Sequence, residues 1–215
     1  MLGQYFFVSA FIAVVFVLLG ALVLSRNPKA VINKIFFAIS ITTGVWLVVN
    51  SIAGRSDFTI LQIRVTNHIT FLFGLLATFG LAMFSKVFTK TQGGTLWKTL
   101  VVSNVLSAIL CLTPLTISGA KIVGDTNELE FGPLVTLYFL TVVANCLASA
   151  GLLIYHKKRY KGVRRSQTNL ILGGFLSATI IIMITNIVFP SVFKIYALTS
   201  VGSFAIVFII VAIAT

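Results

Sequence analysis

The sequence alternates long apolar runs with short polar segments, and this pattern restricts what the chain can fold into. Each run is close to the roughly 20 residues that a helix needs to cross a ~30 Å hydrocarbon layer. Charged residues make up only 9% of the chain, whereas soluble domains carry about 25%. We therefore expect one all-α integral membrane domain over residues 1–215, a seven-transmembrane helix bundle. The expected spans are about 4–25, 34–53, 64–87, 97–113, 133–156, 168–188 and 195–214.

The basic residues predict how the bundle is oriented. The segments beside the first, third and fifth connections hold twelve Lys and Arg residues, and the second, fourth and sixth hold four. Because short cytoplasmic loops are enriched in Lys and Arg, the N-terminus is predicted outside and the C-terminus in the cytoplasm. Arg26 and Lys29 follow the first run, and no basic residue precedes it. This order indicates an uncleaved anchor rather than a signal peptide.

The fourth connection is the longest external one. Residues 116–123 and 128–131 flank the turn-rich tetrapeptide Gly-Asp-Thr-Asn, and Gly132-Pro133 follows. This arrangement predicts a short extracellular β-hairpin between helices four and five. The hairpin is either a solvated connector or a lid over an outward-facing pocket.

The apolar runs lack the groups that most enzymes and pumps need. They contain no Asp or Glu, so carboxylate proton relays and paired-acid catalysis have no support. His68 and His156 are expected near opposite membrane faces, too far apart to share a metal. Cys111 and Cys146 are expected at different depths and unbridged. No nucleophile motif, phosphate-binding loop or retinal-binding lysine is recognisable, so we expect no catalytic residues, metal or cofactor.

Polar and aromatic side chains gather in the predicted outer half of the runs. Arg64 and His68 are four residues apart, which places them on one helix face. A small polar or anionic ligand entering from outside is one interpretation, and His68 could respond to pH. Interhelical hydrogen bonding and interface anchoring by Trp and Tyr are the alternatives. The candidate ligand-binding residues are Trp46, Asn50, Arg64, Asn67, His68, Phe71, Tyr138, Asn186, Tyr196 and Ser200.

Several short motifs, in order along nearly the whole chain, resemble the N-terminal seven-transmembrane sensor region of bacterial histidine kinases. The motifs are Arg26-Asn27-Pro28 through Asn33, Phe36-Phe37 and Trp46, then Thr113-Pro114-Leu115, Phe131-Gly132-Pro133-Leu134, Arg164-Arg165 to Gln167, Asn186 with Pro190, and Gly202.

This resemblance implies a multi-pass receptor in the bacterial inner membrane that belongs to a two-component system. Such a receptor detects an external or membrane-borne signal and passes it through helix seven to a cytoplasmic kinase domain. No kinase segment occurs within these 215 residues, so the chain is expected to be either a fragment of a longer receptor or a bundle that needs a partner. The expected partners are the bilayer, a small ligand and a second copy of the chain. The placement of the basic residues argues against a nucleic-acid partner.

Two other functions remain open from the sequence. Asn33 and Asn50 bracket the second run, and Asn169 and Asn186 bracket the sixth at the same spacing. If helices one to three and five to seven are repeats around helix four, a small-solute transporter with a 3+1+3 arrangement follows. The third interpretation is a purely structural membrane subunit.

Overall fold

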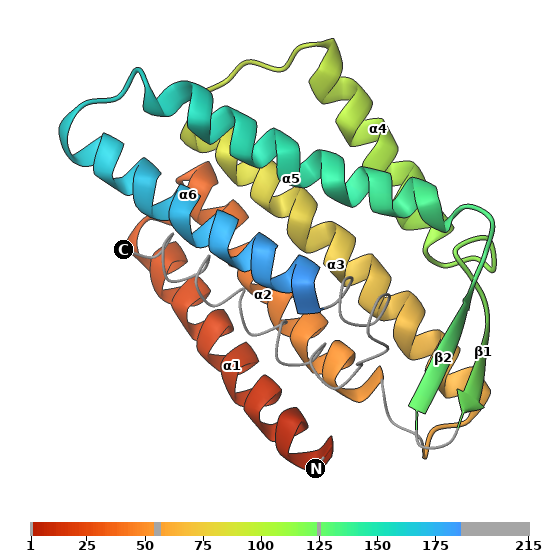
Figure 1. The fold of residues 1–215 in the computed structure, drawn as a ribbon. Helices are drawn as coiled ribbons and strands as arrows, with labels where there is room; N and C mark the ends of the chain where they lie inside the picture. The colour runs from red at the N-terminus through yellow and green to blue at the C-terminus, as the bar shows by residue number, and fades with distance from the viewer. Residues whose placement is uncertain (1, 54–56, 124–125, 186–215) are drawn as a thin grey trace.

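A computed structural model describes residues 2–53, 57–123 and 126–185. This part of the chain is mainly helical, with one small sheet, and the elements follow in a simple order (Figure 1). The elements are α1 (Leu2–Arg26), α2 (Val31–Ala53), α3 (Ile60–Phe88), α4 (Thr95–Leu110), β1 (Ile117–Val123), β2 (Thr126–Phe131), α5 (Val135–Lys157) and α6 (Gly162–Met183).

Four of the helices in the described ranges are long and apolar enough to cross a membrane: α1 from Phe6, α2, α3 and α5. Helix α4 has 16 residues, which gives about 24 Å at 1.5 Å per residue. Helix α6 begins at Gly162 rather than near 168, because the helix continues into the polar segment that holds Arg164 and Arg165. The length and composition of these four helices indicate a helical membrane protein. The predicted run 195–214 lies outside the described residues.

Helix α3 lies at the centre of the described bundle and contacts α2, α4 and α5. Helix α1 packs on α2, and α6 packs on α5 (Figure 1). The larger core unites side chains of α1, α2, α3, α5 and α6, among them Phe16, Phe36, Phe84, Leu153 and Phe175. Segments far apart in sequence therefore share one interior.

The connections divide between two ends of the bundle (Figure 1). We name the end formed by residues 26–34, 86–98 and 157–165 the basic end, since it holds the twelve Lys and Arg residues of the three odd connections. A hydrogen bond of 3.1 Å between Thr91 Oγ1 and His156 Nε2 joins the second of these segments to the end of α5 (Val135–Lys157). We name the opposite end, formed by residues 57–64 and 111–134, the hairpin end.

The predicted hairpin is confirmed. Strands β1 and β2 pair antiparallel with Ala120 opposite Leu129, and a bulge lies between Ile117 and Gly119. Strand β2 starts two residues earlier than predicted, because Thr126 pairs with Val123 instead of remaining in the turn. The side-chain amide of Asn127 donates to the carbonyl of Ala53 over 3.4 Å, which ties the hairpin to the end of α2.

Candidate functional site

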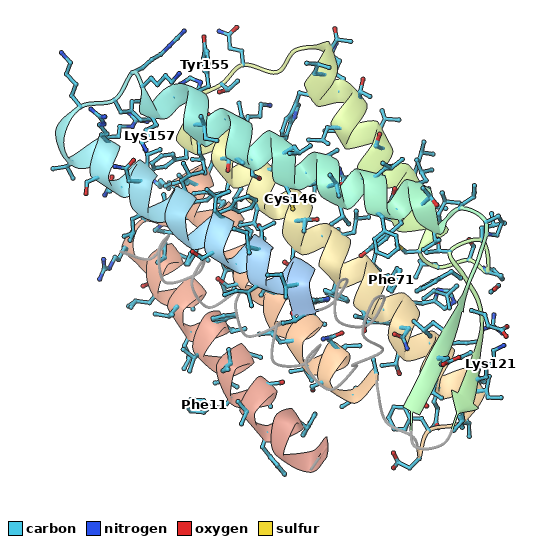
Figure 2. The ribbon with its side chains drawn as sticks, in the orientation of Figure 1. Phe11, Phe71, Lys121, Cys146, Tyr155 and Lys157 are labelled. Carbon is cyan, nitrogen blue, oxygen red and sulfur yellow. The ribbon has the colours of Figure 1, made fainter. Side chains whose placement is uncertain are left out.

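Aromatic rings from two helices and the hairpin meet at the hairpin end. Phe71 of α3 stacks on Tyr138 of α5 with ring centroids 4.6 Å apart, and Phe131 of β2 lies 6.3 Å from Phe71. Phe139 completes the group, 5.4 Å from Tyr138. We call these four residues the aromatic cluster; Figure 2 shows Phe71 on the side of the bundle that carries the hairpin. The hairpin therefore packs on the helices rather than standing free in solvent.

Trp46 joins this group from α2. A Cβ atom added to Gly74 of α3 would lie 3.2 Å from Trp46 Nε1 and 3.4 Å from the Tyr138 hydroxyl. The Tyr138 hydroxyl itself donates to the carbonyl of Phe71 over 3.2 Å. Three of the predicted site residues, Trp46, Phe71 and Tyr138, thus converge on one stretch of α3. The absence of a side chain at Gly74 makes the room for them.

His68 is fixed against the end of α4. Its Nδ1 atom lies 2.5 Å from the carbonyl oxygen of Cys111. Because a carbonyl oxygen only accepts, Nδ1 carries the hydrogen in this contact. Cys111 and Cys146 are both free thiols, as predicted from their depths. His68 therefore couples α3 to the segment that leads into the hairpin.

The other predicted residues of α2 and α3 have different surroundings. Asn67 is buried and its amide donates 2.8 Å to the carbonyl of Ile63 in its own helix. Arg64 is partly buried, and within the described part of the chain its Nε atom is buried with no hydrogen-bond acceptor. Asn50 is partly buried near the end of α2. Of these three, Arg64 is the one that carries a charge, and its Nε atom is unpaired within the described residues.

Three predicted site residues cannot be placed. Asn186, Tyr196 and Ser200 lie outside the described residues. Asn169, the partner of Asn186 in the predicted asparagine repeat, is exposed on α6. The hairpin-end arrangement described above rests on α2, α3, α4, α5 and the hairpin alone.

A polar contact between α4 and α5 was not predicted. The side-chain amides of Asn104 and Asn145 donate to each other, each over 2.9 Å, and Asn145 also donates 3.2 Å to Thr78 of α3. Ser107 and Thr141 form a second bond of 2.9 Å between the same helices. In each helix the asparagine lies three or four residues from the hydroxyl residue and therefore on the same face. This spacing is the sequence signal that could have predicted the contact.

Two cavities lie at the other end of the molecule. Their volumes are about 520 and 360 Å³, and their walls come from the basic end, chiefly from α2, α3 and α6. None of the predicted site residues lines either cavity. The hairpin end therefore offers converging side chains, and the basic end offers open volume.

Comparison of the chain with protein-family models, curated proteins and solved structures finds no match in any of the three.

Proposed function

We propose that the chain is the membrane sensory domain of a bacterial receptor of the histidine-kinase type. In this proposal seven helices span the inner membrane, the hairpin end faces outward, and the basic end faces the cytoplasm. A signal received at the hairpin end passes through helix seven to a cytoplasmic kinase domain. The placement of twelve Lys and Arg residues at one end supports this orientation.

The observation that carries the proposal is the convergence at the hairpin end. Side chains from α2, α3 and α5 meet there with β2, so a small ligand bound among them would contact several elements at once. A ligand changes a conformational equilibrium only through different affinities for the two states. Contacts with several elements supply such a difference whenever the elements shift relative to one another. Arg64 would attract an anionic or polar ligand to this end.

A transporter, the alternative suggested by the asparagine repeat, would need free polar groups near the middle of the membrane. Asn104 and Asn145 bond to each other and are buried, with Asn145 0% exposed. Amides that satisfy each other hold helices together and leave few polar groups to line a solute path. The pairing favours the receptor over the transporter.

The receptor proposal is tested in a fusion of the chain to the kinase domain of a bacterial histidine kinase. Phe71→Ala should change basal autophosphorylation at least threefold in either direction, because it removes the ring that joins α3, α5 and β2. Phe11→Ala on α1 is the matched control, since Phe11 is 70% exposed and lies far from the cluster (Figure 2). Unchanged output from correctly inserted Phe71→Ala protein would overturn the proposal.

A second pair of variants tests the charge at the hairpin end. Arg64→Ala should change the same output, whereas Lys98→Ala, an exposed cation at the basic end, should not. Equal outputs would remove Arg64 from the mechanism. Liposomes containing only this chain should show no flux of labelled small solutes; substrate flux would favour the transporter instead.

The proposed orientation has its own test. Ser118→Cys on the hairpin and Lys158→Cys at the basic end both place a thiol at an exposed position. In intact cells a membrane-impermeant maleimide should label the first variant and spare the second. The reverse labelling would invert the topology.

A further inference from the structure

The two cavities at the basic end adjoin each other. Both are bounded by Ile32 of α2, Phe88 of α3, and Val163 and Gln167 of α6. Their volumes of about 520 and 360 Å³ are each within the roughly 300–1,000 Å³ range of small-molecule sites. The pair forms one recess, which we call the inner recess.

Much of the inner recess is apolar. Phe36 and Phe84 form its deep wall and are almost fully buried. Leu170 on the same wall is 50% exposed, and Val163 at the mouth is 75% exposed. Exposed apolar side chains beside an empty volume favour an occupant with an apolar portion.

A fixed cation stands at the mouth of the recess. The Nη2 atom of Arg164 donates 2.9 Å to the carbonyl of Phe88, and its guanidinium lies 4.4 Å from the centre of the Tyr160 ring. Both partners are neutral, so they hold the side chain in place and leave its charge uncompensated. Lys90, which lines the same recess, adds a second positive charge.

The start of α6 adds to this positive field. Val163 and Arg164 lie in its first turn and line the recess. No acidic residue lies in that turn, and the N-cap residue Lys161 makes no side-chain capping bond. The positive end of the helix dipole and its free N–H groups therefore remain available to an anion.

Within the described part of the chain, no Asp or Glu lies at this end. All four acidic residues lie between positions 57 and 130, in the segments of the hairpin end, whereas the basic end holds twelve Lys and Arg residues. Within the described residues, therefore, no acidic side chain is available to pair with Arg164 or Lys90.

We propose that the inner recess binds one anionic phospholipid of the adjacent leaflet. The phosphate contacts Arg164, Lys90 and the start of α6, and an acyl chain lies against the apolar wall toward Phe36 and Leu170. A soluble anion would use the cations and leave the apolar wall exposed. Anionic head groups in basic pockets between membrane helices follow the same physical logic. This site is separate from the hairpin end and stands whether or not the chain is a receptor.

The test is native mass spectrometry of the full chain, released from detergent with added lipid. Dioleoyl-phosphatidylglycerol should be retained at least fivefold more than dioleoyl-phosphatidylcholine. Dihexanoyl-phosphatidylglycerol, with short acyl chains, should bind at least fivefold more weakly than the long-chain lipid. Excess glycerol 3-phosphate should not displace the long-chain lipid. Equal retention of the two long-chain lipids, or displacement by glycerol 3-phosphate, would overturn the proposal.

Matched variants localise the binding. Arg164→Gln with Lys90→Gln should lower phosphatidylglycerol retention at least fivefold, whereas Arg165→Gln with Lys158→Gln removes the same charge outside the recess and should change it less than twofold. Equal losses would show diffuse attraction to the basic loop and overturn the site. Arg164→Lys keeps the charge and should restore most of the retention.

If the double variant fails to fold, Lys90→Gln alone, at an exposed position, should still lower phosphatidylglycerol retention measurably. No change in retention would overturn the role of the recess.

Discussion

The hairpin end and the basic end of this bundle differ in packing and in charge. At the hairpin end, rings from α3, β2 and α5 pack together, and the hairpin covers the helix ends. The basic end holds three times as many Lys and Arg residues as the rest of the chain, has no acidic residue, and contains the inner recess. One end is closed by packing, and the other is bounded by cations and holds the inner recess.

The polar side chains at the two ends also differ in their surroundings. At the hairpin end, Tyr138 and His68 bond to backbone carbonyls of the chain. At the basic end, Arg164 and Lys90 line the recess, and Lys98 and Lys158 are exposed. The free energy of unfolding should therefore depend more on tight packing at the hairpin end than on any single contact at the basic end. The substitutions below test this expectation.

The largest effect is expected from Gly132→Ala at the base of the hairpin. The added Cβ would lie 2.3 Å from the carbonyl oxygen of Leu115 and 2.4 Å from that of Pro114. These are backbone atoms, so the hairpin base must move, at a cost of about 3 kcal/mol. The free energy of unfolding in mixed detergent micelles measures this loss.

Gly151→Ala is the control for that substitution. Gly151 is exposed on α5, and nothing lies within 4 Å of its added Cβ. This variant should be neutral or stabilised by up to about 1 kcal/mol. If Gly132→Ala behaves like Gly151→Ala, the hairpin end is not closed by packing.

An intermediate effect is expected between the two ends, at the amide pair. Asn145→Leu removes the bonds to Asn104 and Thr78 and leaves the Asn104 carbonyl unsatisfied, which should cost about 2 kcal/mol. Replacing both asparagines by Leu should cost less than the sum of the two single changes, because no buried amide is then left alone. Strict additivity in the unfolding free energies would show that the pair is not coupled.

The sequence predicted what depends on local pattern. Apolar run length and the polar breaks gave helices α1–α6, and the turn-rich tetrapeptide indicated the hairpin. Trp46, Phe71 and Tyr138 were predicted at similar depths, and they converge around Gly74. That convergence needed only the direction and length of each helix.

The remaining features depend on how helices shift and tilt against each other. The bond between Asn104 and Asn145 joins residues 41 apart in sequence, and run boundaries do not determine their relative depth. The inner recess lies between side chains of α2, α3 and α6. Its shape depends on how these helices pack, which the pattern of apolar and polar residues does not predict. From the sequence, the basic residues predicted only the orientation of the bundle.

A smaller effect is expected from Asn33→Ala at the basic end. Its amide donates 2.9 Å to the carbonyl of Val23 and 3.1 Å to that of Asn27, so it caps the end of α1. Loss of these partly exposed bonds should cost about 1 kcal/mol. The exposed neighbour Lys34→Ala should change the unfolding free energy by less than about 0.5 kcal/mol. A loss as large as that of Gly132→Ala would erase the contrast between the two ends.

The smallest effect is expected at the ion pair on the hairpin surface. Lys121 Nζ lies 2.9 Å from Glu130 Oε1, and both side chains are about half exposed. The hydrogen bond and charge of Glu130 raise the pKa of Lys121 above its ordinary value of 10.5. A raised pKa in the folded state stabilises the protein below the unfolded pKa, and this contribution disappears as the pH rises through the folded pKa.

The free energies of unfolding of wild type and Lys121→Met should therefore differ by a constant offset from pH 7 to 9. The two should converge only above pH 10.5. Since solvent screens this pair, an offset comparable to that of Asn33→Ala would show that the hairpin end is held by charge as well as by packing.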